Sequence, residues 1–166
     1  MFPSERQKRL SYAVFGIYFI LLVWLVLFKF STSFSDLPNI RSINLIPLYY
    51  DQQTSTHGKE VFFNIIVFIP LGIYVQVFRH NWNIAVKCTV SLLTSLLLEV
   101  IQFIFAIGAS DITDLIGNTL GGMLGILSCM MLEKIAPKKF ISIINLLGMC
   151  IELVAIGLLV LLLAVN

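Results

Sequence analysis

Residues 84–132 read IAVKCTVSLLTSLLLEVIQFIFAIGASDITDLIGNTLGGMLGILSCMML, and this stretch decides the fold. It holds two long apolar runs joined by the short segment 107–111, which contains Gly108. A run of about 20 apolar residues is long enough to cross a bilayer as an α-helix. The stretch therefore predicts two membrane-spanning helices, 84–107 and 112–132, which fold back on each other around Gly108.

Four polar side chains interrupt these two apolar runs. Glu99 and Gln102 come late in the first run, and Asp114 and Asn118 come early in the second. Folding back about Gly108 brings Glu99 to the depth of Asn118 and Gln102 to the depth of Asp114. A carboxylate inside hydrocarbon is costly without a partner or water, so such residues are functional candidates by default. The sequence predicts one polar cluster there.

The whole composition fits a membrane protein. Hydrophobic residues make up 58% of the 166 and charged residues only 12%, about half the charged fraction of soluble domains. No linker or repeat divides the chain, which predicts one membrane domain over residues 1–166. We expect an all-α, polytopic bundle of about five transmembrane helices, with Pro70 bending the second. The predicted spans are 10–28, 62–78, 84–107, 112–132 and 140–165.

The distribution of basic residues predicts the orientation, because segments on the cytoplasmic side are enriched in Lys and Arg. With the N-terminus inside, the outer loop 29–60 holds only Lys29, Arg41 and Lys59. The inner segments hold the other basic residues: Arg6, Lys8, Arg9, Arg79, Lys87, Lys134, Lys138 and Lys139. We expect a multi-pass protein of the bacterial cytoplasmic membrane, with its N-terminus cytoplasmic, its C-terminus outside and the polar cluster in the outer half.

The outer loop contributes a second group of candidates. Its segment 41–48 is too short to span and too apolar for a free loop, which predicts an interfacial or re-entrant segment against the outer mouth of the bundle. Arg41 and Asn44 lie in this segment, and Asn64 lies just inside the second span on the same side. All three are therefore expected within reach of the carboxylates.

These residues also form four ordered motifs between Arg41 and Leu132. They are Asn44-Leu45-Ile46-Pro47, then Asn64-x-x-x-Phe68-x-Pro70-x-Gly72, then Ser95-x-x-x-Glu99-x-x-Gln102, then Asp111-Ile112-x-Asp114-x-x-x-Asn118-Thr119-x-Gly121. In these motifs residues 41–132 resemble the VanZ-like family, small bacterial membrane proteins named for a member associated with teicoplanin resistance. The resemblance implies a cell-envelope role but supplies no reaction. It also shows one departure: many members carry an Arg where this chain has Gly108.

Structural roles compete with functional ones at several of these positions. Asp111 and Asp114 could mark the start of a helix, with Asp111 as its N-cap. Gln102 and Asn118 could serve as hydrogen bonds between helices. The repeat of Gly117, Gly121 and Gly125 is typical of close helix packing.

Three classes of function fit the polar cluster. The first is binding or modification of an amphiphilic ligand at the outer leaflet, a lipid-linked cell-wall precursor or a glycopeptide, which would lower teicoplanin susceptibility. The second is a metal-assisted transferase or hydrolase acting on a lipid-linked phosphate or glycan, with Glu99 and Asp114 catalytic and a divalent cation as cofactor. The third is a small oligomeric transporter. The sequence leaves open whether the protein is an enzyme.

The partners expected are membrane lipids and the amphiphilic ligand, with a second copy of the chain as a further candidate and no nucleic acid. The identity of any bound metal is unknown. The candidate ligand-binding residues are Arg41, Asn44, Asn64, Glu99, Gln102, Asp111, Asp114 and Asn118.

Overall fold

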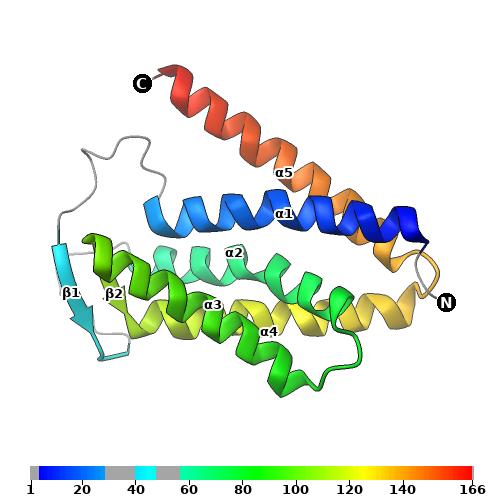
Figure 1. The fold of residues 1–166 in the computed structure, drawn as a ribbon, viewed down its shortest axis with the longest axis horizontal. Helices are drawn as coiled ribbons and strands as arrows, with labels where there is room; N and C mark the ends of the chain where they lie inside the picture. Colours follow the sequence, from blue (N-terminus) through cyan, green and yellow to red (C-terminus); the bar gives the residue numbers. More distant parts are fainter. Residues whose placement is uncertain (1–3, 29–39, 48–56, 166) are drawn as a thin grey trace.

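The computed structural model describes residues 4–28, 40–47 and 57–165. Within these residues, five helices and two short strands follow one another (Figure 1). In order they are α1 (Glu5–Phe28), β1 (Ile40–Asn44), α2 (His57–Phe78), α3 (Ile84–Phe105), β2 (Ile107–Asp111), α4 (Ile112–Ile135) and α5 (Phe140–Val165).

All five helices are long and apolar enough to cross a membrane. They match the five predicted spans in number and order, and most boundaries agree within a turn. Large apolar side chains cover their outer faces, for example Leu97 at 59% and Leu153 at 71% exposure. An exterior of this kind suits hydrocarbon rather than water. The chain is a multi-pass membrane protein.

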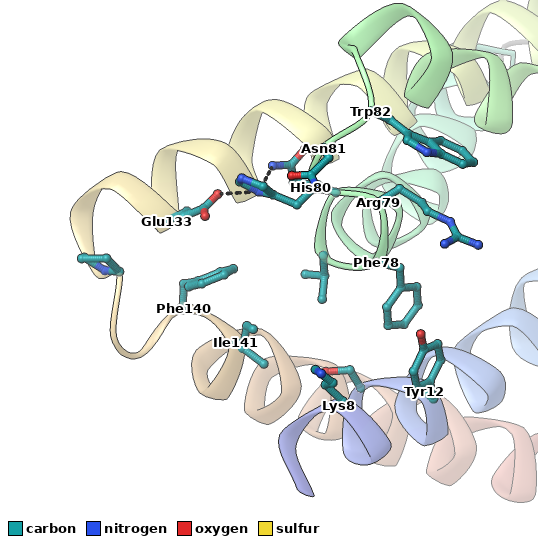
Figure 2. A pocket seen from close by; sticks show the side chains of 14 residues that line it. Lys8, Tyr12, Phe78, Arg79, His80, Asn81, Trp82, Glu133, Phe140 and Ile141 are labelled. Carbon is teal, nitrogen blue, oxygen red and sulfur yellow. Dashed lines mark hydrogen bonds and ion pairs between the residues drawn. The ribbon is translucent and has the colours of Figure 1, made fainter. Parts of the chain in front are cut away.

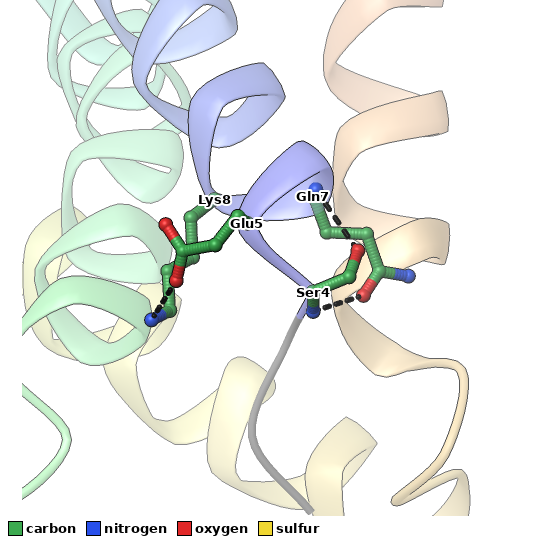
Figure 3. A network of polar contacts seen from close by, with 4 residues as sticks. All are labelled: Ser4, Glu5, Gln7 and Lys8. Carbon is green, nitrogen blue, oxygen red and sulfur yellow. Dashed lines mark hydrogen bonds and ion pairs between the residues drawn. The ribbon is translucent and has the colours of Figure 1, made fainter.

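The first helix begins before its apolar run, because polar residues cap it. The backbone amide of Ser4 donates to Gln7 Oε1 at 3.1 Å, and the amide of Gln7 donates to Ser4 Oγ at 3.2 Å (Figure 3). This reciprocal pair is a capping box, which supplies acceptors for amides that the helix itself leaves without one. Lys8 Nζ also donates to Glu5 Oε1 at 2.9 Å. Helix α1 therefore extends to Glu5, beyond the predicted start.

Helices α2 and α4 form the centre of the bundle, and glycines set how closely they approach. A Cβ atom added at Gly121 or Gly125 would collide with the backbone carbonyls of Ile65 or Ile69, and one at Gly72 would collide with Gly122. The packing role predicted for the glycine repeat is confirmed at these positions. At Gly117 the nearest atom to such a Cβ, the Val61 carbonyl oxygen, lies at 3.6 Å, an ordinary contact.

Helix α2 continues through Pro70, which has no backbone amide to donate. The hydroxyl of Tyr18, from α1, lies at this point. It donates to the Val67 carbonyl at 2.8 Å and accepts from the Leu71 amide at 3.1 Å. One side chain of a neighbouring helix thus serves a carbonyl and an amide that lie one turn apart beside the proline.

Strands β1 and β2 pair in parallel at one end of the bundle, in the register Ile40↔Ile107 to Asn44↔Asp111. We call this pair the ribbon and its end of the bundle the strand end (Figure 1). The segment 107–111 is therefore an extended strand rather than a simple turn, and residues 41–44 of the predicted interfacial or re-entrant segment form a strand as well. Pairing gives both backbones hydrogen-bond partners outside the helices. Leu48, the last residue of the predicted interfacial segment, lies outside the described residues.

The opposite end of the bundle holds the start of α1, the α2–α3 turn and the α4–α5 turn (Figure 1). We call it the basic end, because the basic residues that the sequence assigns to the inner side lie there: Arg6, Lys8, Arg9, Arg79, Lys87, Lys134, Lys138 and Lys139. Helix α5 packs mainly along α1 and joins it through a bond of 3.0 Å from Ser11 Oγ to Asn145 Oδ1.

Candidate functional site

A pocket of about 220 Å³ lies near the strand end, and four helices contribute to it. We call it the strand-end pocket. Its apolar wall comes from α1 and α2 and consists of Leu25, Val26, Phe63 and Val67. Its polar wall comes from α2, α3 and α4 and consists of Glu60, Asn64, Glu99, Gln102, Asp114 and Asn118.

The polar wall is built from three pairs, one on each of three helices. Glu60 and Asn64 are four residues apart on α2, and Asp114 and Asn118 have the same spacing on α4; the α3 pair, Glu99 and Gln102, is three residues apart. Residues at these spacings project from one face of a helix. Each helix therefore needs only one face toward the pocket to present two polar groups.

Hydrogen bonds fix the amide groups of the pocket. Asn64 Nδ2 donates to Asp114 Oδ1 at 2.7 Å, which ties α2 to α4. Asn118 Nδ2 donates to Ser95 Oγ at 2.8 Å, which ties α4 to α3. Gln102 Nε2 donates to the Val26 carbonyl at 2.8 Å, which ties α3 to α1. All four helices around the pocket are thus connected through its own polar residues.

Two of these amides each keep a buried oxygen that has no partner among the described residues. Gln102 and Asn118 are only 1% exposed, yet Gln102 Oε1 and Asn118 Oδ1 accept no hydrogen bond from the described residues. A buried acceptor left without a donor costs about 1–3 kcal/mol. The pocket therefore contains acceptors that a ligand or water would satisfy.

Glu99 connects the pocket to the ribbon. Its Oε2 accepts from the backbone amide of Asp111 at 3.2 Å, and its own carbonyl accepts from Ser110 Oγ at 2.9 Å. Both bonds hold the end of β2 against α3. Glu99 is 6% exposed, so this carboxylate is both buried and anchored.

The pocket unites five of the eight predicted ligand-binding residues: Asn64, Glu99, Gln102, Asp114 and Asn118. Glu99 and Asn118, and likewise Gln102 and Asp114, were predicted to lie at matching depths in one cluster, and all four line the pocket. The partners seen for the two amides are instead Ser95 for Asn118 and the Val26 carbonyl for Gln102.

Asp111 and Asn44 lie beside the pocket rather than in its wall. Asp111 is the N-cap of α4, and its Oδ1 accepts from the Thr113 amide at 2.7 Å. Its Oδ2 accepts from Asn44 Nδ2 at 3.0 Å. Asp111 thus has the N-cap role that the sequence left open. The hydrogen bond from Asn44 connects β1 to this N-cap residue.

Arg41 also lies outside the pocket wall. Its guanidinium donates to the Ile104 carbonyl near the end of α3 at 3.2 Å. In the ribbon its backbone is paired with Gly108, the position at which the family resemblance implies an Arg. Strand β2 has no basic side chain at Gly108, but Arg41 at the paired position of β1 supplies one.

Sequence reasoning missed Glu60 and the apolar wall. The spacing of Glu60 and Asn64 on one helix face is a signal that could have identified Glu60. Nothing in the apolar run of α1 distinguishes Leu25 and Val26 from their neighbours, because the packing of helices distant in sequence selects them.

The carboxylate and amide side chains of the pocket mainly offer hydrogen-bond acceptors. Three carboxylates, from Glu60, Glu99 and Asp114, line it, and no Lys, Arg or His of the described chain does so. Among the described residues no three His, Cys, Asp or Glu side chains are grouped closely enough to hold a metal ion. The arrangement therefore suits a ligand that brings N–H or O–H donors, above all a cationic amine.

The sequence of the chain matches one family of known proteins. The profile of the VanZ/LLP1 family matches residues 15–133. Protein VanZ of Enterococcus faecium is 43% identical over 122 residues, which cover 72% of this chain and 73% of that protein. No solved structure gives a significant match.

Proposed function

Since the chain belongs to the VanZ/LLP1 family, we propose that it binds or modifies an amphiphilic ligand at the outer leaflet of the cytoplasmic membrane. The ligand is a lipid-linked cell-wall precursor or a glycopeptide, and the result is lower susceptibility to teicoplanin-type glycopeptides. The strand-end pocket carries this proposal, because it combines buried acceptors with an apolar wall.

The size of the pocket indicates which part of the ligand it takes. Pockets that enclose a drug-sized molecule measure about 300–1,000 Å³, whereas this one measures about 220 Å³. It suits one polar end of an amphiphile, with the rest of the molecule outside. The acceptor character of the wall favours an end that carries an amine, an amide N–H or hydroxyl groups.

The membrane location supports an amphiphile over a soluble ligand. The pocket lies among helices that span the bilayer, and its apolar wall includes Phe63, which is half exposed. With the N-terminus inside, as the basic residues predict, the pocket faces the outer leaflet. Lipid-linked precursors and lipoglycopeptides present a polar group beside an apolar chain at that depth.

Two variants test the proposal, Glu99→Gln and Asp114→Asn, in a teicoplanin-susceptible bacterium that expresses the chain. Each keeps the acceptor oxygen but removes the charge that a cationic or donor-rich ligand requires. We expect susceptibility to return to that of cells without the protein, while membrane abundance and thermal unfolding stay unchanged.

Glu133→Gln is the matched control, since it removes one carboxylate at the opposite end of the bundle. Full protection by both pocket variants would refute the proposal. A loss of protection that follows a loss of folded protein would instead assign these carboxylates to the architecture.

A further inference from the structure

A second and larger cavity, of about 500 Å³, lies at the basic end. It is bounded by α1, the α2–α3 turn, the end of α4 and the start of α5 (Figure 2). We call it the basic-end cavity. It shares no lining residue with the strand-end pocket, and the function proposed above makes no use of it.

A buried lysine lies behind the wall of this cavity and forms hydrogen bonds with two residues that line it. Lys87 is 2% exposed, and its Nζ donates to Gln76 Oε1 at 2.6 Å and to the His80 carbonyl at 2.8 Å. Gln76 and His80 both line the cavity. Both acceptors are neutral, and Lys87 makes no salt bridge within the described part of the chain. A buried ammonium without a counter-ion is strongly unfavourable, so this wall favours an anion nearby.

The other charges of the cavity leave it positive. Arg79 lines it and lies 5.1 Å from the centre of the Trp82 ring in a cation–π contact, and no carboxylate that the structure describes forms an ion pair with it. Lys8 lines it from α1, and its partner Glu5 is an exposed residue of the same helix. Such an exposed pair is weak. The one carboxylate in the wall, Glu133, lies 3.5 Å from His80 Nδ1 (Figure 2).

Aromatic rings flank the cavity at the membrane surface. The ring of Tyr12 stacks on Phe78 at 4.5 Å, and Tyr12 and Trp82 are 61% and 43% exposed. Tyr and Trp at the end of a transmembrane bundle typically lie at the level of lipid headgroups. A ligand in the basic-end cavity would therefore meet cations at its polar end and aromatic rings beside it.

From these contacts we propose that the basic-end cavity is a binding site for the phosphate headgroup of an anionic phospholipid from the leaflet on that side. Arg79 and Lys8 contact the phosphate, and the buried charge of Lys87 strengthens its binding through the low-dielectric wall of Gln76 and His80. The acyl chains then lie along the exposed faces of Tyr12 and Trp82. Bound lipid would place a phosphate anion near Lys87, whose hydrogen bonds within the described residues go to neutral acceptors.

The fluorescence of Trp82 provides a direct measurement. Trp24→Phe leaves Trp82 as the single tryptophan of the full chain, which is purified in a neutral detergent and titrated with short-chain phosphatidylglycerol. We expect a saturable change in Trp82 emission. Phosphatidylcholine of equal chain length carries the same phosphate but also a choline cation, which the basic residues of the cavity repel, so it should bind at least about ten-fold more weakly.

Variants of the basic residues identify the cavity as the site. Arg79→Gln and Lys87→Gln should each weaken phosphatidylglycerol binding about ten-fold. Lys138→Gln, which removes an exposed charge at the same end but outside the cavity wall, should bind as the parent does. If Lys87→Gln does not fold, Arg79→Gln still tests whether the lipid binds in this cavity, because Arg79 lies on an exposed turn.

Equal affinity for the two lipids, or Arg79→Gln binding as tightly as the parent, would overturn the proposal. Competition by inorganic phosphate at concentrations similar to those of the lipid would identify a soluble anion as the ligand and would also overturn it.

Discussion

The hydroxyl of Tyr18 forms hydrogen bonds with two backbone groups of α2 that would normally be satisfied within the helix. In a regular α-helix the Leu71 amide would donate directly to the Val67 carbonyl, but Pro70 disturbs the ladder beside them. Tyr18 accepts from that amide and donates to that carbonyl. A polar group of this kind, left without a partner in hydrocarbon, would cost several kcal/mol.

Removing this hydroxyl gives a prediction at the scale of one atom. Tyr18→Phe should lower the free energy of unfolding by about 1–3 kcal/mol, because both backbone groups lose the hydrogen bond that Tyr18 supplies. Thermal unfolding in detergent measures the change. Tyr12→Phe is the control: the Tyr12 side chain is 61% exposed and contacts Phe78 through its ring, so its loss should be within about 0.5 kcal/mol. Equal behaviour of the two variants would contradict the bridging role.

The polar residues of the strand-end pocket were largely predictable one by one. Glu99 and Gln102 stand out in an apolar run, and Asp114 and Asn118 stand out in the next. The reverse holds for Lys87, which the sequence counts only as a marker of orientation, although the structure buries it. Its burial depends on Gln76 of another helix, and no local pattern reveals such a partner.

At the scale of elements, α2 and α4 pack closely because glycines leave room for backbone contact between them. A Cβ at Gly121 would fall on the Ile65 carbonyl, so the two helices could not keep their present spacing. Close approach of this kind replaces the hydrophobic effect as a cause of association inside a membrane. The sequence pattern predicted this role for the glycines, but it did not name α2 as the partner.

Gly121→Ala should therefore separate α2 from α4 and lower the free energy of unfolding by about 1–3 kcal/mol. The pocket residues Asn64 and Asp114 bridge the same two helices, so the protection against teicoplanin that we propose should fall as well. Gly16→Ala is the control, since a Cβ there meets nothing within 4 Å and alanine is the better helix former. The measurements are the thermal midpoint and glycopeptide susceptibility. An unchanged midpoint in Gly121→Ala would show that the helices can shift without cost.

The ribbon is the element that the sequence described least well. The apolar character of residues 41–48 indicated an interfacial segment, and the exposed Ile43, Leu45 and Ile46 fit that location. Its pairing with residues 107–111 was not predictable, because parallel strands need a long connection between them. Here that connection includes two complete membrane spans, and local periodicity carries no information about it.

For the whole molecule, the two ends of the bundle have opposite chemistry. The strand-end pocket contains carboxylates and amide oxygens, and the basic-end cavity contains ammonium and guanidinium groups. The asymmetry of Lys and Arg predicts that the basic end faces the cytoplasm. In this predicted orientation the pocket would face the outer leaflet and the cavity the inner one.

Cysteine labelling of intact cells tests this orientation. In a background without the native cysteines, Ser42→Cys in the ribbon should react with a membrane-impermeant thiol reagent, and Asn81→Cys in the α2–α3 turn should react only after the cells are opened. Both positions are exposed, so accessibility within the protein does not separate them. The opposite labelling pattern would place the strand-end pocket at the cytoplasmic side.

The parallel pairing of β1 with β2 also has a consequence for biogenesis. A chain leaves the ribosome at about 5–20 residues per second, and β1 is complete well before α2 and α3, the two spans that precede β2, have been made. The ribbon can close only after the third span has been inserted, and the Asn64–Asp114 bond needs the fourth. The strand-end pocket is therefore absent from every intermediate that precedes the insertion of α4, and it can assemble before α5 is inserted.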